Sequence, residues 1–170
     1  MNLPRAFAVG VLGLLGVWGQ APEPDPGRGV AYAPVFDLVR LVNGWWAMEQ
    51  NRLVALNPDQ AQQALPLLRS LAEPPHLSLE MAQQTRFALE ALLTPAQQQW
   101  WSAYQQAQQQ AFQRWSAKVR TLGPVNLYAY TVPGYWSMLQ EIGTGQPFNP
   151  FRRPPNASTL ARLIARLEGR

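Results

Sequence analysis

The sequence predicts an all-α protein with four main helices in a hairpin or bundle arrangement, followed by an irregular, proline-rich aromatic segment and a short terminal helix. Three observations lead to this fold class. Apolar residues recur at three- and four-residue steps along most of the chain. A Leu-x-Pro-x-Gln motif occurs twice and has the features of a helix start. Proline and glycine pairs, such as Pro74-Pro75 and Gly123-Pro124, follow the periodic stretches and end them.

The N-terminal segment, residues 1–19, resembles a secretory signal peptide. Arg5 supplies a positive charge, residues 6–17 form an apolar run of 12 residues, and Val17-Trp18-Gly19 is a suitable cleavage site. The run is shorter than the ~20 residues that a spanning helix needs. The alternative is an uncleaved anchor, and only that form would associate with a membrane. We therefore expect a periplasmic or secreted protein of the bacterial envelope, with residues 20–33 as a proline-rich leader.

The first helix is expected from Pro34 to Leu53. Its apolar stripe consists of Leu38, Leu41, Val42, Trp45 and Met48. Gly44 lies inside this helix, where glycine costs about 1 kcal/mol relative to alanine. We therefore expect a neighbouring helix to approach closely at Gly44.

The two motif copies start the second and fourth helices. In each copy the second residue is the expected N-cap, the proline takes the first helical position and the glutamine reaches back to the cap. The motif residues are Leu56, Asn57, Pro58 and Gln60 in the first copy, and Leu93, Thr94, Pro95 and Gln97 in the second. Pro66 is expected to kink the second helix before it ends at Pro74-Pro75.

A third helix, capped by Ser78, is expected to extend to Leu92. The fourth is expected from Pro95 to Leu122, so residues 34–123 form one helical domain.

The periodic pattern weakens in residues 124–170, which are expected to pack on the same domain. Residues 126–131 are predicted as an extended stretch and residues 133–142 as a short helix. Residues 145–155 cannot form a regular element because prolines interrupt them repeatedly. Residues 160–167 form a final short amphipathic helix.

Little catalytic chemistry is available in the chain. It has no cysteine, its only histidine is His76, expected to be a solvated loop side chain, and its ten acidic residues are scattered singly. It has no glycine-rich phosphate loop, and a net charge of +4 is too small for a nucleic-acid footprint. A carboxylate pair assembled in space, for example Glu49 with Glu90, is the remaining route to an enzyme. We expect no catalytic residue, no cofactor, no metal ion and no nucleic-acid partner.

The fourth helix carries the first candidate contact surface. Residues 91–113 contain no charge and nine glutamines. Adjacent Trp100 and Trp101 point about 100° apart on a helix, so one core stripe cannot easily bury both. The contact candidates are Trp100, Trp101, Tyr104 and Gln108. Either they meet a protein partner, an unfolded client or a second copy of the chain in a homodimer, or they pack within the domain.

A second aromatic group lies in the C-terminal segment. Its contact candidates are Tyr135, Trp136, Phe148 and Phe151. These rings form either a platform for a ligand or wall polymer, or anchors that pack the proline-rich tail over the helices.

The motif copies resemble the LTxxQ motif of the Spy and CpxP family of periplasmic stress proteins, with Asn57 replacing Thr in the first copy. The resemblance covers roughly residues 53–122. It implies an exported, all-helical protein without catalytic residues. Family members form dimeric, cradle-like helical hairpins, and some act as chaperones without ATP. Their helices are rich in charge, whereas the corresponding helix here is uncharged and rich in glutamine.

The best functional hypothesis is therefore an exported, non-catalytic envelope protein that binds protein partners and is chaperone-like or stress-related. The alternative is a structural or assembly factor that binds one specific partner or wall polymer through the C-terminal aromatic segment.

Overall fold

The computed structural model describes residues 30–118 and 126–170, and every regular element in these residues is helical. In chain order the elements are α2 (Ala33–Glu49), α3 (Pro58–Ser70), α4 (Leu79–Ala91), α5 (Pro95–Ser116), α6 (Leu127–Thr131), α7 (Tyr135–Gly143), the 3-10 helix η1 (Pro150–Arg152) and α8 (Asn156–Glu168). The all-α prediction is confirmed. The predicted signal peptide, the leader up to residue 29 and the Gly123-Pro124 stop lie outside the described residues.

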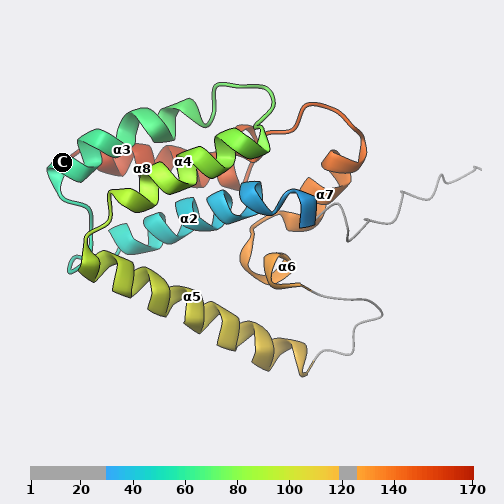
Figure 1. The fold of residues 1–170 in the computed structure, drawn as a ribbon, viewed down its shortest axis with the longest axis horizontal. Helices are drawn as coiled ribbons and strands as arrows, with labels where there is room; N and C mark the ends of the chain where they lie inside the picture. Colours follow the sequence, from blue (N-terminus) through green and yellow to red (C-terminus); the bar gives the residue numbers. More distant parts are fainter. Residues whose placement is uncertain (1–29, 119–125) are drawn as a thin grey trace, which may run out of the picture.

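Helix α2 is the central element of a helical bundle. Ten of its 17 residues are buried, so its surface is apolar on most sides. It packs mainly against α4 and α8, and α8 packs in turn against α3 (Figure 1). Helix α5 runs along one side of this group in Figure 1. Within the described residues, no helix combines the length and apolar character needed to cross a membrane.

The C-terminal helix is a full member of the bundle. It begins at Asn156, four residues before the predicted Leu160, and its buried side includes Leu160, Leu163 and Leu167. The first turn of α8 is mainly polar. Asn156 is nevertheless buried, and its Nδ2 donates to the Pro133 carbonyl at 3.1 Å. A buried asparagine does not register in an apolar pattern, which explains the short prediction.

One predicted helix end is too late. Helix α2 ends at Glu49 instead of Leu53, because the Asn51 side chain accepts the Leu53 backbone N–H at 3.1 Å and turns the chain. Leu53 is 93% exposed. Helix α5 ends at Ser116 and is followed by a turn, whereas the predicted end at Leu122 lies outside the described residues. Helix α3 continues through Pro66.

The extended conformation predicted for residues 126–131 is wrong. The segment forms the five-residue helix α6, started by Asn126, whose side chain accepts the Ala129 backbone N–H at 3.0 Å. This cap outweighs the strand preference of its tyrosines and threonine. The predicted helix over 133–142 is present as α7, which begins after Gly134; the φ of Gly134 is 76°, a conformation that favours glycine.

The proline-rich segment 145–155 is held by polar contacts and contains one turn of 3-10 helix, so the prediction of no regular element is wrong for Pro150–Arg152. Asn149 donates to the carbonyls of Leu71 and Pro74, each at 2.8 Å, and accepts the Phe151 N–H at 2.9 Å. These bonds fix the segment to the C-terminal end of α3.

His76 takes part in the same attachment. Its side chain is exposed, as predicted, but Nδ1 also accepts the Phe148 backbone N–H at 3.2 Å. The Phe148 carbonyl accepts the Leu77 N–H at 2.9 Å. The sole histidine therefore has a structural contact with the tail.

Candidate functional site

The two motif copies meet in space. Both predicted capping boxes are present, with Asn57 and Thr94 as caps. Although Gln60 and Gln97 are 37 residues apart, their buried side-chain amides bond to each other: Gln60 Nε2 donates to Gln97 Oε1 at 2.7 Å, and Gln97 Nε2 donates to Gln60 Oε1 at 3.1 Å. The pair therefore ties the N-terminus of α5 to the N-terminus of α3.

Each glutamine also satisfies backbone groups around this junction. Gln60 Nε2 donates to the Leu92 carbonyl at 2.6 Å, and Gln97 Nε2 to the Ala55 carbonyl at 3.3 Å. Their Oε1 atoms accept the N–H groups of the cap residues at 3.0 and 2.9 Å. Buried amides left without partners would cost about 1–3 kcal/mol each, so the pair favours one placement of α5.

A second anchor of α5 lies one turn further along the helix. Trp101 is 7% exposed and its ring lies against Gly44 of α2. A Cβ atom on Gly44 would lie 2.8 Å from Cη2 and 2.9 Å from Cε3 of that ring, and still closer to Cζ3. A close approach at Gly44 is present as predicted, but it is made by the Trp101 side chain of α5.

A third anchor is a polar network centred on Asp37 of α2. Arg40 donates from Nη2 to Gln108 Oε1 of α5 at 3.4 Å. Asp37 accepts the Tyr128 hydroxyl at 3.0 Å and pairs with Arg86 at 3.4 Å. Burial and then the neighbouring Asp37 carboxylate raise the pKa of Tyr128 to about 12. Gln108, a predicted contact residue, is thus partly buried and bonded within the domain.

Beyond these anchors, α5 is poorly covered. Of its 22 residues, all of which the structure describes, two are buried, Gln97 and Trp101. One side of α5 carries apolar residues at steps of three or four, and we call them the aromatic flank: Trp100, Tyr104, Ala107, Ala111 and Trp115. The rings of Trp100 and Tyr104 stack with centroids 5.1 Å apart. The flank is partly or fully exposed along its whole length.

The far end of the flank joins α6 through a cluster of three rings. The Trp115 ring centroid lies 5.6 Å from that of Tyr130 and 6.2 Å from that of Phe112. Trp115 is 37% exposed and Tyr130 42%. Trp115 was not among the predicted contact residues, whereas Tyr130 belongs to the second aromatic group of the sequence. The spacing offered a signal for Trp115, because 11 residues after Tyr104 is three helical turns and hence the same side.

The C-terminal candidates are mostly inside the protein. Tyr135, Phe148 and Phe151 are 1–2% exposed, whereas Trp136 is 50% exposed. Tyr135 packs on Phe36 with ring centroids 5.1 Å apart. Tyr135, Phe148 and Phe151 therefore anchor the tail. Of the four candidates, Trp136 alone has a largely exposed side chain.

A groove of about 450 Å³ lies on the other side of α5, against α4. Its lining comprises Arg86, Glu90, Leu93, Gln98, Trp101, Ser102 and Gln105. Burial raises the pKa of the Glu90 carboxyl. Glu49 lines a different pocket, so the two carboxylates considered as a catalytic pair are not brought to one site.

Among residues 30–118 and 126–170, no three histidine, aspartate or glutamate side chains are grouped so as to hold a metal ion. The most distinctive surface is therefore the uncharged aromatic flank, held in place by the glutamine pair, Trp101 and the Asp37 network. No family model matches the chain, and neither a curated protein nor a solved structure is found to be similar to it.

Proposed function

We propose that the protein is an exported, non-catalytic envelope protein that binds unfolded or partly folded protein chains through the aromatic flank, as an ATP-independent chaperone does. The observation that carries the proposal is the state of α5. It is a long helix without charge as far as Gln113, it is anchored at three points, and its aromatic flank stays partly or fully exposed although Trp100 and Tyr104 also pack against the core.

The chemistry of the flank suits clients of varied sequence. Large rings contribute apolar contact area without demanding one partner geometry. Glutamine amides carry both donors and acceptors, so those beside the flank can bond the free backbone groups of an unfolded chain. The lack of charge matters because covering a charged side chain carries a desolvation cost, which an uncharged helix avoids.

The resemblance of the two motif copies to the Spy and CpxP family supports the same proposal. The signal-like residues 1–19 support export, which N-terminal sequencing of the protein from an envelope fraction tests. A mature chain beginning at Gln20 is expected. Recovery of the intact N-terminus in a membrane fraction would contradict export as a free protein.

The functional test is suppression of aggregation of several unrelated unfolded proteins at near-stoichiometric ratios. The diagnostic variant is Ala107→Glu with Ala111→Lys, which places an ion pair on the aromatic flank. The matched control is Gln106→Glu with Gln110→Lys, which makes the same pair on an exposed part of α5 away from the flank. Both pairs have the Glu-to-Lys i,i+4 order that supports a helix and leave the net charge unchanged.

We expect the wild type and the control to suppress aggregation and the flank variant to lose most of this effect. Equal activity of the two variants, or no protection by the wild type, would refute the proposal. Sedimentation of the wild type identifies the competing occupant, a second copy of the chain. If the wild type forms a stable dimer that dissociates in the flank variant, and the wild type protects no client, the flank serves dimerisation and not client binding.

A further inference from the structure

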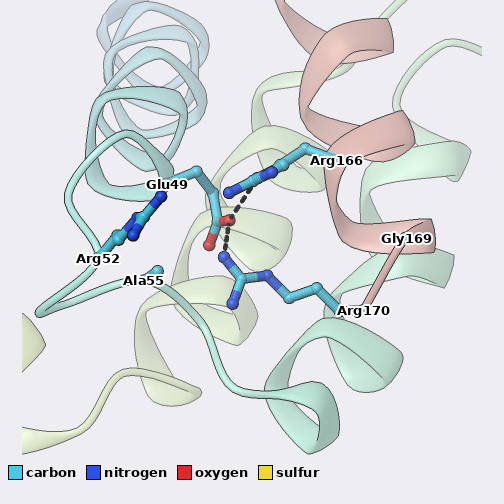
Figure 2. Close-up of a pocket in the computed structure, with 6 residues that line it drawn as sticks. All are labelled: Glu49, Arg52, Ala55, Arg166, Gly169 and Arg170. Carbon is cyan, nitrogen blue, oxygen red and sulfur yellow. Dashed lines mark hydrogen bonds and ion pairs between the residues drawn. The ribbon is translucent and has the colours of Figure 1, made fainter.

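A second candidate site lies away from the aromatic flank, where α2 ends beside α8. Its central group is Glu49, whose side chain is fully buried. Glu49 Oε1 accepts the Leu56 backbone N–H at 2.8 Å, and Oε2 pairs with Arg170 Nη2 at 2.5 Å and Arg166 Nε at 3.7 Å (Figure 2). A buried carboxylate requires such partners, and one arginine suffices to neutralise it.

The site contains more positive charge than this pairing needs. A pocket of about 360 Å³ is lined by Glu49, Arg52, Ala55, Arg166, Gly169 and Arg170. In Figure 2 Arg52 stands on one side of Glu49, while Arg166 of α8 and Arg170, two residues after that helix ends, reach in from the other. Within the described residues the Arg52 side chain has no hydrogen bond or ion pair with another residue.

Three arginines and one glutamate give the lining side chains a net charge of +2. An α-carboxylate on Arg170 would lower the sum by one, and the pocket would remain positive. The nearby Glu168 does not compensate, because it pairs with Arg69 at 2.7 Å. Part of Arg166 is also open to solvent, since its side chain is 54% exposed.

We propose that this pocket binds a phosphate group. A phosphate dianion balances a net charge of +2, and guanidinium groups bind its oxygens through several N–H donors at once. Each guanidinium has five such donors, and Glu49 accepts from only a few of them. Glu49 acts as a positioning residue that holds Arg166 and Arg170 at the pocket wall.

The pocket exceeds the size of a phosphate ion, so the group is expected on a larger molecule. A soluble phosphomonoester is a dianion and a phospholipid headgroup carries a phosphodiester monoanion, but both present phosphate oxygens that guanidinium groups bind. The two sources differ in whether the protein attaches to a lipid surface, and the experiment below distinguishes them.

The test is isothermal titration of the purified protein with inorganic phosphate at pH 8 and low ionic strength, together with co-sedimentation with phosphatidylglycerol vesicles and with phosphatidylcholine vesicles. The variants are Arg52→Gln, whose exposed side chain has no hydrogen bond or ion pair with another described residue, and Arg166→Gln. The matched control is Arg162→Gln, one turn earlier on α8; its guanidinium lies 5.6 Å from the centroid of the Trp46 ring and does not line the pocket.

We expect saturable binding of phosphate to one site, weakened about tenfold by each pocket variant and unchanged in the control. If the protein co-sediments with phosphatidylglycerol vesicles but not with phosphatidylcholine vesicles, and Arg52→Gln abolishes this, the phosphate group belongs to a lipid headgroup. If the protein co-sediments with neither, the phosphate group belongs to a soluble molecule. Unsaturable binding, or an equal loss in Arg162→Gln, would overturn the proposal.

Discussion

Replacing Gly44 by alanine is the most direct perturbation of the contact between α2 and α5. In an isolated helix this change stabilises by about 1 kcal/mol, because alanine has the higher helix propensity. In this structure the new methyl group would overlap the six-membered part of the Trp101 ring, with ring atoms at 2.9 Å or less. The indole is rigid and buried, so the whole side chain or the whole of α5 must shift.

The two contributions oppose each other, and the overlap is expected to dominate. Overpacking of a tightly packed site costs about 1–3 kcal/mol, and an overlap with three ring atoms places this site in the upper part of that range, about 2–3 kcal/mol. After subtraction of the propensity gain, we expect Gly44→Ala to lower the free energy of unfolding by about 1–2 kcal/mol. For a domain of this size that is a fall in Tm of roughly 2–8 °C.

Urea denaturation measures the effect. The urea concentration at the midpoint should fall, while the slope of the unfolding free energy against urea concentration stays unchanged. The same Gly44→Ala substitution is also made in a Trp101→Leu variant, which lacks the indole ring. There Gly44→Ala is expected to be neutral or stabilising, so the two positions should show a coupling energy of about 1–3 kcal/mol. If Gly44→Ala stabilises the protein while Trp101 is present, α5 does not pack at Gly44 and its placement here is wrong.

Three further predictions concern the other anchors. Gln60→Ala and Gln97→Ala should each cost about 1–3 kcal/mol of unfolding free energy, and the double variant should cost less than their sum; additive losses in urea denaturation would mean that the two amides are not coupled. In an ultraviolet titration, Tyr128 should ionise near pH 12, since its folded pKa lies above the ordinary 10.0. The stability that its neutral phenol contributes is fully present below pH 10 and is lost as the pH rises through about 12. Asp37→Asn should lower the pKa of Tyr128, and an unchanged pKa in that variant would argue against the Asp37 contact. Asn149→Ala should cost about 1–3 kcal/mol because two carbonyls near the end of α3 lose their donor, and a thermal midpoint equal to that of the wild type would contradict this anchor.

Local sequence signals predicted the starts of α3, α4 and α5 correctly. Capping depends on a few consecutive residues, so Asn57 and Thr94 could be assigned as caps from the motif alone. The bonding between Gln60 and Gln97 could not, because it arises only when the chain brings two helix starts together. Gly44 was informative because a helix-weakening residue inside a strong helical pattern needs a tertiary reason.

The outcome for the adjacent tryptophans follows from helical geometry. The 100° between neighbouring residues predicted that one core stripe would not bury both, and the structure buries Trp101 while Trp100 stays partly exposed. Which of the two faces the core depended on Gly44, a residue 57 positions away from Trp101, and could not be read locally.

The C-terminal segment was harder to predict. Proline and aromatic residues suggested a tail, but polar side chains decide its structure: Asn126 starts α6, Asn149 fixes the segment to α3, and Asn156 lies buried at the start of α8. Such residues leave no trace in a hydrophobic pattern. The arginine pocket was missed for a related reason, since Glu49 and Arg170 are 121 residues apart and their pairing is purely tertiary.

The central claim is that clients bind the aromatic flank, and site-specific photo-crosslinking tests it most directly. A benzophenone amino acid is placed at Ala107 on the flank or, as the control, at Gln62, an exposed position on α3. Each protein is irradiated with an unfolded client. The account predicts strong crosslinking from position 107 and little from position 62. Equal crosslinking from both positions, or none from position 107, would contradict it.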